Sequence, residues 1–206
     1  MQKIVRYGIL GGTFDPPHLG HLALAQEAYT QLRLDRVWFV PTGDPPHKLN
    51  QEISSAAARL AMTHLAVDTD ERFAVTDIEL RLPKPSYTLA TLAALRAEWG
   101  HAELTLILGW DMLLYLPKWR DPAEVIAAVD HVAAGRRPGH RADDPALNDV
   151  EAAVHGLHTK LVILGGPQLE LSASDIRART ATGLPIRYLV PDAVRAYIQE
   201  HHLYRQ

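Results

Sequence analysis

Residues 9–22 read ILGGTFDPPHLGHL, in which a short apolar run breaks into glycines, prolines and histidines before an apolar pattern resumes. The run that precedes the break, from Lys3 to Leu10, is rich in strand-forming residues. Beyond the prolines, apolar side chains recur at helical spacing from Leu22 to Leu32. The stretch therefore predicts a strand, a loop and a helix that starts near Leu19.

The remainder of the chain repeats this alternation of strands and helices. Further strands are expected at residues 36–41, 73–80, 103–109, 131–137 and 160–166. Further helices are expected at residues 54–67, 86–99, 121–129, 172–183 and 191–204, the first of them with a serine cap. This order favours an α/β fold, a Rossmann-like doubly wound parallel sheet with C-terminal helices.

The length of 206 residues suits one domain that spans the whole chain, residues 1–206. One polar stretch that bears proline and glycine, residues 137–155, is interpreted as a surface insertion. The chain has no cysteine, which leaves no thiol nucleophile, thiolate metal site or disulfide and favours a cytoplasmic location. Neither a signal peptide nor a membrane-spanning segment is expected.

The formal net charge of −3 gives no general attraction to nucleic acid or to an anionic membrane. A polyanion would have to be met by a local group of basic side chains and backbone N–H donors. The partners expected are therefore small molecules, with no nucleic acid and no membrane. The sequence does not decide between a monomer and a homo-oligomer.

In a doubly wound sheet, ligands bind at the carboxyl ends of the strands, where residues 11–22 lie. Gly11 and Gly12 let backbone N–H groups approach a phosphate, and the following helix directs its positive dipole end at the same space. His18 and His21 lie at the start of that helix, where both imidazoles could donate to phosphate oxygens. A metal site would need further ligands at useful spacing, and a purely structural role rarely takes both histidines of such a turn, so phosphate binding is favoured.

Two motifs carry a resemblance to a known superfamily. GGTFDPPHLGHL at 11–22 resembles the signature of the nucleotidyltransferases with an HxGH motif, and LSASDIR at 171–177 resembles their late serine-rich motif. Ser174 departs from the threonine frequent there but keeps the hydroxyl. Shorter matches are similar to the bacterial nicotinate-nucleotide adenylyltransferase family: PPHK at 45–48, PSYTLAT at 85–91, LGWDMLLYLPKW at 108–119 and GRRPG at 135–139.

The resemblance implies adenylyl transfer from ATP to nicotinate mononucleotide, a step of NAD biosynthesis that gives nicotinate adenine dinucleotide and pyrophosphate. It implies Mg²⁺ carried with the ATP phosphates, with no metal site in the protein itself. A phosphate monoester is already an anionic nucleophile, so positioning and charge stabilisation suffice. The catalytic residues implied are His18, His21 and Arg177.

The resemblance also divides the candidate site between two ligands. The residues expected to bind ATP are Gly11, Gly12, Thr13, Phe14, His18, His21, Gly109, Asp111, Ser174, Ile176 and Arg177. The residues expected to bind nicotinate mononucleotide are Asp15, Lys48, Tyr87, Thr88 and Trp119.

Several of these residues have ordinary structural alternatives. Asp111 follows a buried strand and suits a ribose diol, or it caps the helix after it. Ser174 either meets phosphate or is an ordinary N-cap. Lys48 either reaches the mononucleotide phosphate or is simply solvated, and Trp119 either stacks on the pyridinium ring or belongs to the core. Arg136 and Arg137 face solvent or clamp a phosphate.

Five other functions are weighed at this point. The chain could prefer nicotinamide mononucleotide, or be a pantetheine-phosphate or cytidylyl enzyme, although the PSYT and LPKW segments argue against the last two. It could be a non-catalytic nucleotide-sensing module, but a pure binder would be free to lose His18 and His21. A class I aminoacyl-tRNA synthetase fragment would need a KMSKS-like loop and a basic tRNA face, and the sequence shows neither.

Overall fold

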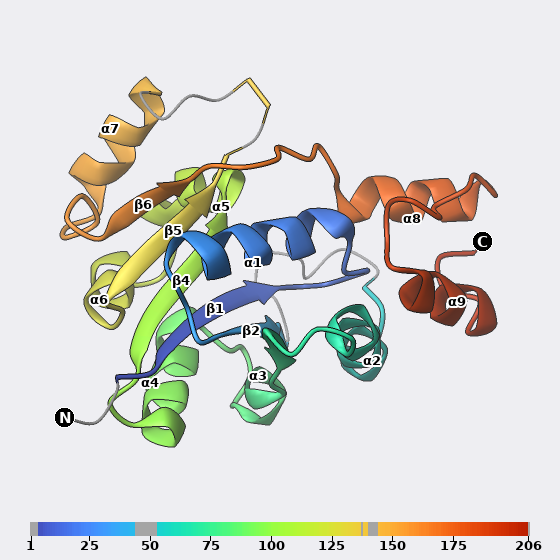
Figure 1. Cartoon of the computed structure of the whole chain (residues 1–206), viewed down its shortest axis with the longest axis horizontal. Coiled ribbons are helices and arrows are strands. Elements are labelled where there is room, and N and C mark those ends of the chain that lie inside the picture. Colours follow the sequence, from blue (N-terminus) through green and yellow to red (C-terminus); the bar gives the residue numbers. More distant parts are fainter. Residues whose placement is uncertain (1–3, 44–52, 137, 140–143, 206) are drawn as a thin grey trace.

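The computed structural model describes residues 4–43, 53–136, 138–139 and 144–205. Its centre is a six-stranded sheet in the order β3-β2-β1-β4-β5-β6, in which every neighbouring pair is parallel (Figure 1). The strands are β1 (Arg6–Gly12), β2 (Arg36–Pro41), β3 (Phe73–Val75), β4 (Glu103–Gly109), β5 (His131–Gly135) and β6 (Leu161–Leu164). The predicted doubly wound parallel sheet is confirmed.

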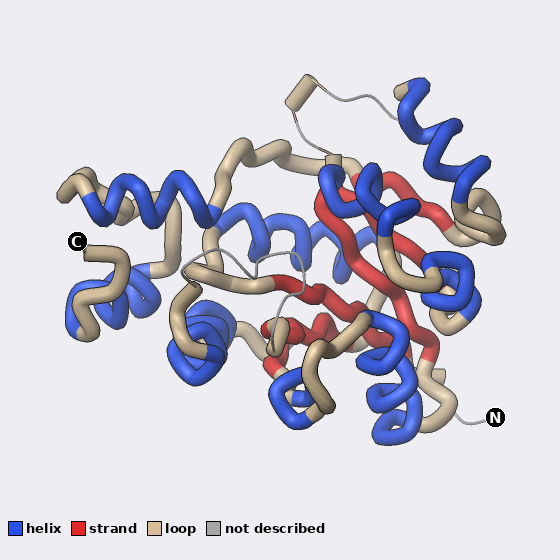
Figure 2. Tube along the Cα trace, turned by 180° about the vertical axis from the view of Figure 1, so that it is seen from behind, coloured by secondary structure: helices blue, strands red, loops and turns tan. Residues whose placement is uncertain are grey.

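Helices cover both faces of this sheet (Figures 1 and 2). One face is covered by α1 (Leu19–Gln31) and α2 (Ala56–Val67), and their core extends to the C-terminal helices α8 (Ala173–Ala181) and α9 (Asp192–Glu200). The other face is covered by α4 (Thr88–Trp99), α5 (Trp110–Tyr115), α6 (Pro122–Ala127) and α7 (Pro145–Ala153). Within the described residues, no helix is long and apolar enough to cross a membrane.

The strand β4 shows how the sequence builds two cores from one run of apolar residues. Leu104, Leu106 and Leu108 point to the core shared with α4, α5, α6 and α7, whereas Ile107 points to the core shared with α1. All four side chains are buried. Burying one such side chain stabilises the fold by roughly 1.5–3 kcal/mol, so an apolar residue is favoured at every position of a strand with two covered faces.

The strand order reverses direction at β1, and this reversal positions the site. The chain passes from β1 to β2 on one side, and β4 later pairs with β1 on the other side. The helices that follow β1 and β4, α1 and α5, lie on opposite faces, so a crevice opens between the two strand ends. Gly11, Gly12 and Gly109 lie at these ends.

Residues 73–80 do not form one continuous strand, so that prediction is wrong. β3 ends at Val75, and residues Ile78–Arg81 form the short helix α3. The Thr76 N–H still bonds to the Phe39 carbonyl at 3.0 Å, and the Thr76 hydroxyl then accepts from the Ile78 N–H at 3.3 Å. The alternating pattern of residues 73–80 therefore covers two elements, the end of a strand and a helical turn that buries Ile78.

The stretch 137–155 contains a helix that packs partly into the core. Its second half forms α7, in which Asp144 is the N-cap and its carboxylate accepts the Ala146 N–H at 3.0 Å. Leu147 and Val150 of α7 are buried in the core with α5. The other residues of α7 are mostly exposed, so the interpretation of 137–155 as a surface insertion stays a prediction. The other predicted elements are present, with ends shifted by a few residues.

Candidate active site

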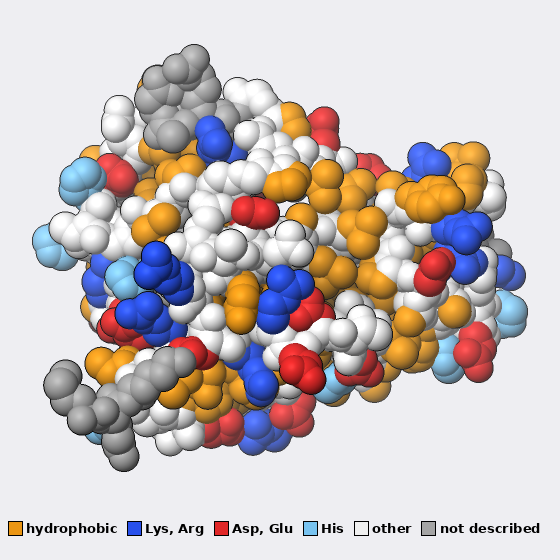
Figure 3. Space-filling model, in the orientation of Figure 1, with side chains coloured by type: hydrophobic (Ala, Val, Ile, Leu, Met, Phe, Trp, Pro, Cys, Tyr) orange, Lys and Arg blue, Asp and Glu red, His pale blue; other side chains and the backbone are white. Residues whose placement is uncertain are grey.

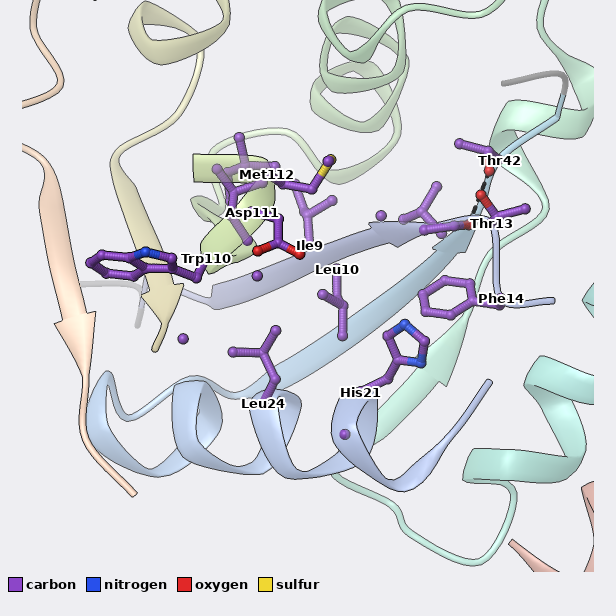
Figure 4. A pocket seen from close by; sticks show the side chains of 18 of the residues that line it. Ile9, Leu10, Thr13, Phe14, His21, Leu24, Thr42, Trp110, Asp111 and Met112 are labelled. Atoms are coloured by element: carbon purple, nitrogen blue, oxygen red, sulfur yellow. Dashed lines mark hydrogen bonds between the residues drawn. The ribbon is translucent and has the colours of Figure 1, made fainter. Parts of the chain in front are cut away.

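A cavity of about 860 Å³ opens at the carboxyl ends of β1 and β4. In Figure 4, His21 and Leu24 point into it from α1, and Asp111 points toward the same space from the start of α5. The predicted site residues that line it are Gly11, Gly12, Thr13, Phe14, Asp15, His18, His21, Tyr87, Thr88, Gly109, Asp111, Trp119, Arg136 and Ser174. Lys48 and Arg137 lie outside the described residues.

The glycines at the end of β1 serve two different purposes. A Cβ atom on Gly11 would have no neighbour within 4 Å, so the backbone there borders open space. A Cβ atom on Gly12 would lie 3.0 Å from the buried ring of Phe14, which itself has a positive φ of 50°. The Thr42 hydroxyl donates to the Gly12 carbonyl at 3.1 Å (Figure 4). Gly11 thus exposes backbone to a ligand, and Gly12 makes room for Phe14.

The two histidines meet at the start of α1, in which His18 is the N-cap. Their rings stack with centroids 3.7 Å apart and an interplanar angle of 25°. The His18 backbone N–H donates to Nδ1 of His21 at 3.2 Å, so a neutral His21 carries its proton on Nε2, where it can donate to a ligand. A Cβ atom on Gly20 would lie 3.0 Å from Nδ1 of His18, so this glycine makes room for the imidazole itself.

The late serine-rich motif reaches the same place from the other end of the chain. Ser172 is the N-cap of α8 and accepts the Asp175 N–H at 3.0 Å, so the alternative of Ser174 as the cap is wrong. Ser174 lines the cavity and accepts from Arg177 at 3.3 Å. Arg177 also donates to the Asp15 carbonyl at 2.9 Å and is not among the lining residues. The side chain of Ile176 is buried in the core, and its predicted contact with ATP stays a prediction.

Asp111 lies in the first turn of α5, directly after β4. The N-cap of that helix is Gly109, so the alternative of Asp111 as the cap is wrong. A Cβ atom on Gly109 would have no neighbour within 4 Å. The carboxylate therefore borders the cavity at the strand end, as expected for a group that meets a ribose diol.

The far end of the cavity is formed by the start of α4 and the segment after α5. α4 begins at Thr88 rather than at Ser86, and Tyr87 is its N-cap. The guanidinium of Arg120 lies 4.6 Å from the centroid of the Tyr87 ring. Trp119 follows the short 3₁₀ helix η1 (Leu116–Lys118), lines the cavity and also packs against the core. The first turn of α4 and the side chain of Trp119 thus line the same cavity.

Asp15 lines the cavity, but its carboxylate is held by the protein. It is 2% exposed, and its two oxygens accept from the Tyr204 hydroxyl at 2.6 Å and from the Ser54 N–H at 3.1 Å. The predicted contact of Asp15 with the mononucleotide is therefore not what its carboxylate does in this structure. Instead, Asp15 joins the β1–α1 loop (residues 13–18) to the segment just before α2 and to the C-terminal tail (residues 201–205).

Glu79 is a buried lining residue that sequence reasoning missed. Its carboxylate accepts from the Thr91 hydroxyl at 2.8 Å, the Ser86 hydroxyl at 3.3 Å and the Gly43 N–H at 3.4 Å. Burial raises the pKa of Glu79, and the hydrogen bonds from Thr91, Gly43 and Ser86 oppose that rise only in part. Glu79 therefore ties the end of β2 to the start of α4. Glu79 lies in a stretch whose alternating pattern predicted a strand, and that prediction gave no sign of its role at the site.

Arg59 is the second buried charge that sequence reasoning missed. It is 2% exposed, and its guanidinium donates to the carbonyls of Thr13 at 2.9 Å, Gly43 at 3.0 Å and Ser54 at 3.1 Å. These carbonyls belong to three separate segments that border the site. The sequence did offer one signal, a single arginine within the apolar helix sequence AAARLAM. A charged side chain buried in such a helix requires hydrogen-bond partners from neighbouring segments.

The described residues contain no group of three or more histidine, cysteine, aspartate or glutamate side chains that could hold a metal ion. On the face drawn in Figure 3, acidic and basic side chains lie interspersed rather than gathered by sign.

Paired imidazoles at a helix start and a serine from a second helix line this cavity at the switch point of a parallel sheet, which suits the cavity to a phosphate-bearing ligand. The cytidylyltransferase-like family model matches residues 9–179.

Curated relatives narrow this match. A protein of Roseiflexus sp. (strain RS-1) named "Probable nicotinate-nucleotide adenylyltransferase" is 46% identical over 96% of this chain and 97% of its own. A protein of Thermomicrobium roseum with the same name is 42% identical over 97% of this chain and 92% of its own. The chain belongs to the nicotinate-nucleotide adenylyltransferase family, as its motifs predicted.

Solved structures agree on the fold. Plasmodium falciparum nicotinic acid mononucleotide adenylyltransferase complexed with NaAD superimposes with a TM-score of 0.78 at 14% identity, covering 97% of each chain. The same protein complexed with APC gives a TM-score of 0.75 at 15% identity, again covering 97% of each chain. At this level of identity, the likeness establishes the shared architecture alone.

The raised pKa of Glu79 predicts a pH dependence of stability. A carboxyl whose pKa is higher in the folded state contributes stability at low pH that is lost as the pH rises through the folded value. Glu79→Gln cannot ionise, so its melting temperature should rise relative to the wild type between about pH 4 and pH 8. Thermal unfolding at several pH values measures this, with the exposed Glu98→Gln as the control for loss of one carboxylate. A difference that stays constant or shrinks over that range would contradict the assignment.

Proposed function

We propose that this chain transfers the adenylyl group of ATP to the phosphate of nicotinate mononucleotide, giving nicotinate adenine dinucleotide and pyrophosphate, a step of NAD biosynthesis. The observation that carries the proposal is the convergence of His18, His21 and Ser174 on one cavity at the β1–β4 switch point. The family of the close relatives supports it. The predicted cytoplasmic location stays a prediction.

The reaction needs no protein nucleophile. A phosphate oxygen of the mononucleotide forms a bond to the α-phosphorus of ATP, and the bond from that phosphorus to the bridging oxygen of the β-phosphate breaks. Pyrophosphate leaves with the electron pair, and no net oxidation occurs. The protein has to align the two phosphates and stabilise the charge on the transferring and departing groups.

The groups at the start of α1 suit the ATP phosphates. His21 offers Nε2–H as a donor because its Nδ1 accepts the His18 N–H, and the dipole of the 13-residue helix favours negative charge at the same point. Ser174, near the start of α8, adds a hydroxyl close to the departing pyrophosphate. Arg177 holds Ser174 and the Asp15 carbonyl in this structure, and we assign its guanidinium to the β- and γ-phosphates once ATP is bound.

The other end of the cavity suits the mononucleotide. The pyridinium ring carries a positive charge, and the indole of Trp119 is a favourable partner for it. Backbone N–H groups at Tyr87 and Thr88 would meet the nicotinate carboxylate at the start of α4. Asp111 lines the same cavity, where it would bind a ribose hydroxyl. Lys48 remains assigned to the mononucleotide phosphate by its motif alone.

Magnesium would enter with the nucleotide. A cluster of three carboxylate or imidazole ligands is missing from the described part of the chain, whereas ATP phosphates and water supply the oxygen ligands that Mg²⁺ prefers. When bound, the ion would neutralise charge on the phosphates. His18 and His21 would act as phosphate donors beside it and not as its ligands.

Two alternatives are decided by one assay. A nucleotide-sensing module would bind ATP without releasing pyrophosphate, and a nicotinamide mononucleotide enzyme would turn over the amide substrate. Release of pyrophosphate from ATP and Mg²⁺ with each mononucleotide in turn separates these alternatives from the proposed reaction.

Replacing His21 tests the proposed catalytic role. His21→Ala removes a donor to the transition state, so kcat should fall by about 10²-fold or more while KM changes little for either substrate. Steady-state pyrophosphate release measures both constants. His64→Ala on the outer side of α2 is the matched control. An unchanged kcat in a folded His21→Ala protein would refute the role.

Removing divalent metal tests the proposed source of Mg²⁺. A chelator should abolish turnover, because the ATP phosphates lose their counterion, yet leave the melting temperature of the nucleotide-free protein the same. Turnover and thermal unfolding are measured in the same buffers, with excess Mg²⁺ restored as the control. If the nucleotide-free protein melted earlier in chelator, it would hold a structural ion.

The nicotinate carboxylate should be recognised through donors at the start of α4. Nicotinamide offers an NH₂ group where the site offers N–H groups, so kcat/KM should be about 10²-fold or more lower for nicotinamide mononucleotide. Trp119→Ala should weaken the binding of both mononucleotides about equally, because the pyridinium charge is common to both. Equal kcat/KM values in the wild type, or loss of the preference in Trp119→Ala, would refute this account of the base pocket.

A further inference from the structure

The C-terminal tail reaches back to the loop that begins the active site. The hydroxyl of Tyr204 donates to Oδ1 of Asp15 at 2.6 Å, across a sequence separation of 189 residues. Asp15 stands in the β1–α1 loop, between Phe14, which packs on the ring of His21, and the histidine pair. A short O–H···O⁻ bond of this kind is among the stronger hydrogen bonds in proteins.

The tail adopts a strained backbone to make this contact. His202 has a φ of 50° and Tyr204 a φ of 63°, a region that residues other than glycine occupy at some cost. The turn is closed by the Leu203 N–H, which donates to the Ile198 carbonyl at 3.0 Å, and both Leu203 and Tyr204 pack against the core of α1, α2 and α9. A conformation of this kind persists only where its contacts outweigh the strain.

The Tyr204 hydroxyl also remains protonated, so the hydrogen bond to Asp15 keeps its donor. Burial and the neighbouring charge of Asp15 raise the pKa of Tyr204, so the phenol keeps its proton and remains a donor at any pH at which the enzyme would work. Asp15 in turn is 2% exposed, and loss of the donor would leave a buried carboxylate oxygen without this partner.

A second contact of the C-terminal region acts on the same loop. The Leu19 N–H, the first of α1, donates to the Leu189 carbonyl at 3.0 Å. Arg177 binds the Asp15 carbonyl. The β1–α1 loop is therefore fixed at its start and at its end by residues that come more than 150 positions later in the chain.

We propose that Tyr204 is a positioning residue for the nucleotide phosphates: through Asp15 it fixes the β1–α1 loop, and with it the imidazoles of His18 and His21. The proposal rests on the proposed function insofar as the ATP phosphates bind at this loop. It assigns the C-terminal tail to the ATP half of the site, because the mononucleotide half is built on α4 and the segment after α5, which the tail does not include.

Tyr204→Phe tests the proposal, because it keeps the ring and removes only the hydroxyl. The kcat/KM for ATP should fall about tenfold or more, while the KM for nicotinate mononucleotide changes less than about twofold. Tyr197→Phe, on the neighbouring helix α9, is the matched control and should behave as the wild type. Asp15→Ala removes the acceptor and should produce at least as large a loss, and the double variant no greater loss than Asp15→Ala alone, because the Tyr204 hydroxyl then has no Asp15 oxygen to hold.

The outcomes separate a positioning role from a merely structural one. Tyr204→Phe with a lower melting temperature but unchanged kinetic constants would overturn the proposal, as would a rise in the KM for nicotinate mononucleotide as large as the fall in kcat/KM for ATP, or additive losses in the double variant. If Tyr204→Phe does not fold, Asp15→Ala decides by the same two measurements, the kcat/KM for ATP and the KM for nicotinate mononucleotide. If the wild type binds ATP but releases no pyrophosphate, the proposed function fails. The positioning role is then decided by calorimetry, which compares the affinity of the wild type for ATP with that of Tyr204→Phe.

Discussion

The pairing of β1 with β2 on one side and β4 on the other is the constraint on which the site depends. Gly11 lies opposite Val40 of β2, while Leu10 lies opposite Ile107 of β4. Three strand ends consequently reach one edge of the sheet, and α1 and α5 leave it on opposite faces. The crevice between them exists because parallel strands need crossovers, and the crossovers change direction here.

Buried charges hold the loops that this sheet brings together. Arg59 spans the carbonyls of three segments, and Glu79 joins the end of β2 to the start of α4. Asp15 joins the β1–α1 loop to the segment just before α2 and to the C-terminal tail. Hydrogen bonds to charged groups contribute roughly 1.5–3 kcal/mol each, and removing one partner leaves a buried charge that costs several kcal/mol. Such contacts favour one loop geometry over its neighbours, which matters for a reaction catalysed by alignment.

The site accordingly separates into two halves with different chemistry. The half built on α1 and α8 offers imidazole and hydroxyl donors together with a helix dipole, all suited to phosphate. The half built on α4 and the segment after α5 offers an indole face and backbone N–H groups, suited to a cationic aromatic ring with a carboxylate. Asp111 lines the same cavity from the first turn of α5, directly after the central strand β4.

The sequence by itself determined the alternation of strands and helices, the parallel sheet and the place of the histidine pair, because apolar periodicity, glycines and caps act within a few residues of one another. It did not determine that Asp15 is held by Tyr204 and Ser54, that Ser172 rather than Ser174 caps α8, that residues 73–80 divide at Val75, or that α7 packs into the core. Nor did it reveal Arg59 and Glu79 as partners of the loops. Those features depend on contacts between segments far apart in the chain. Only the tertiary structure decided them, because a charged group that is buried there must be hydrogen-bonded or paired.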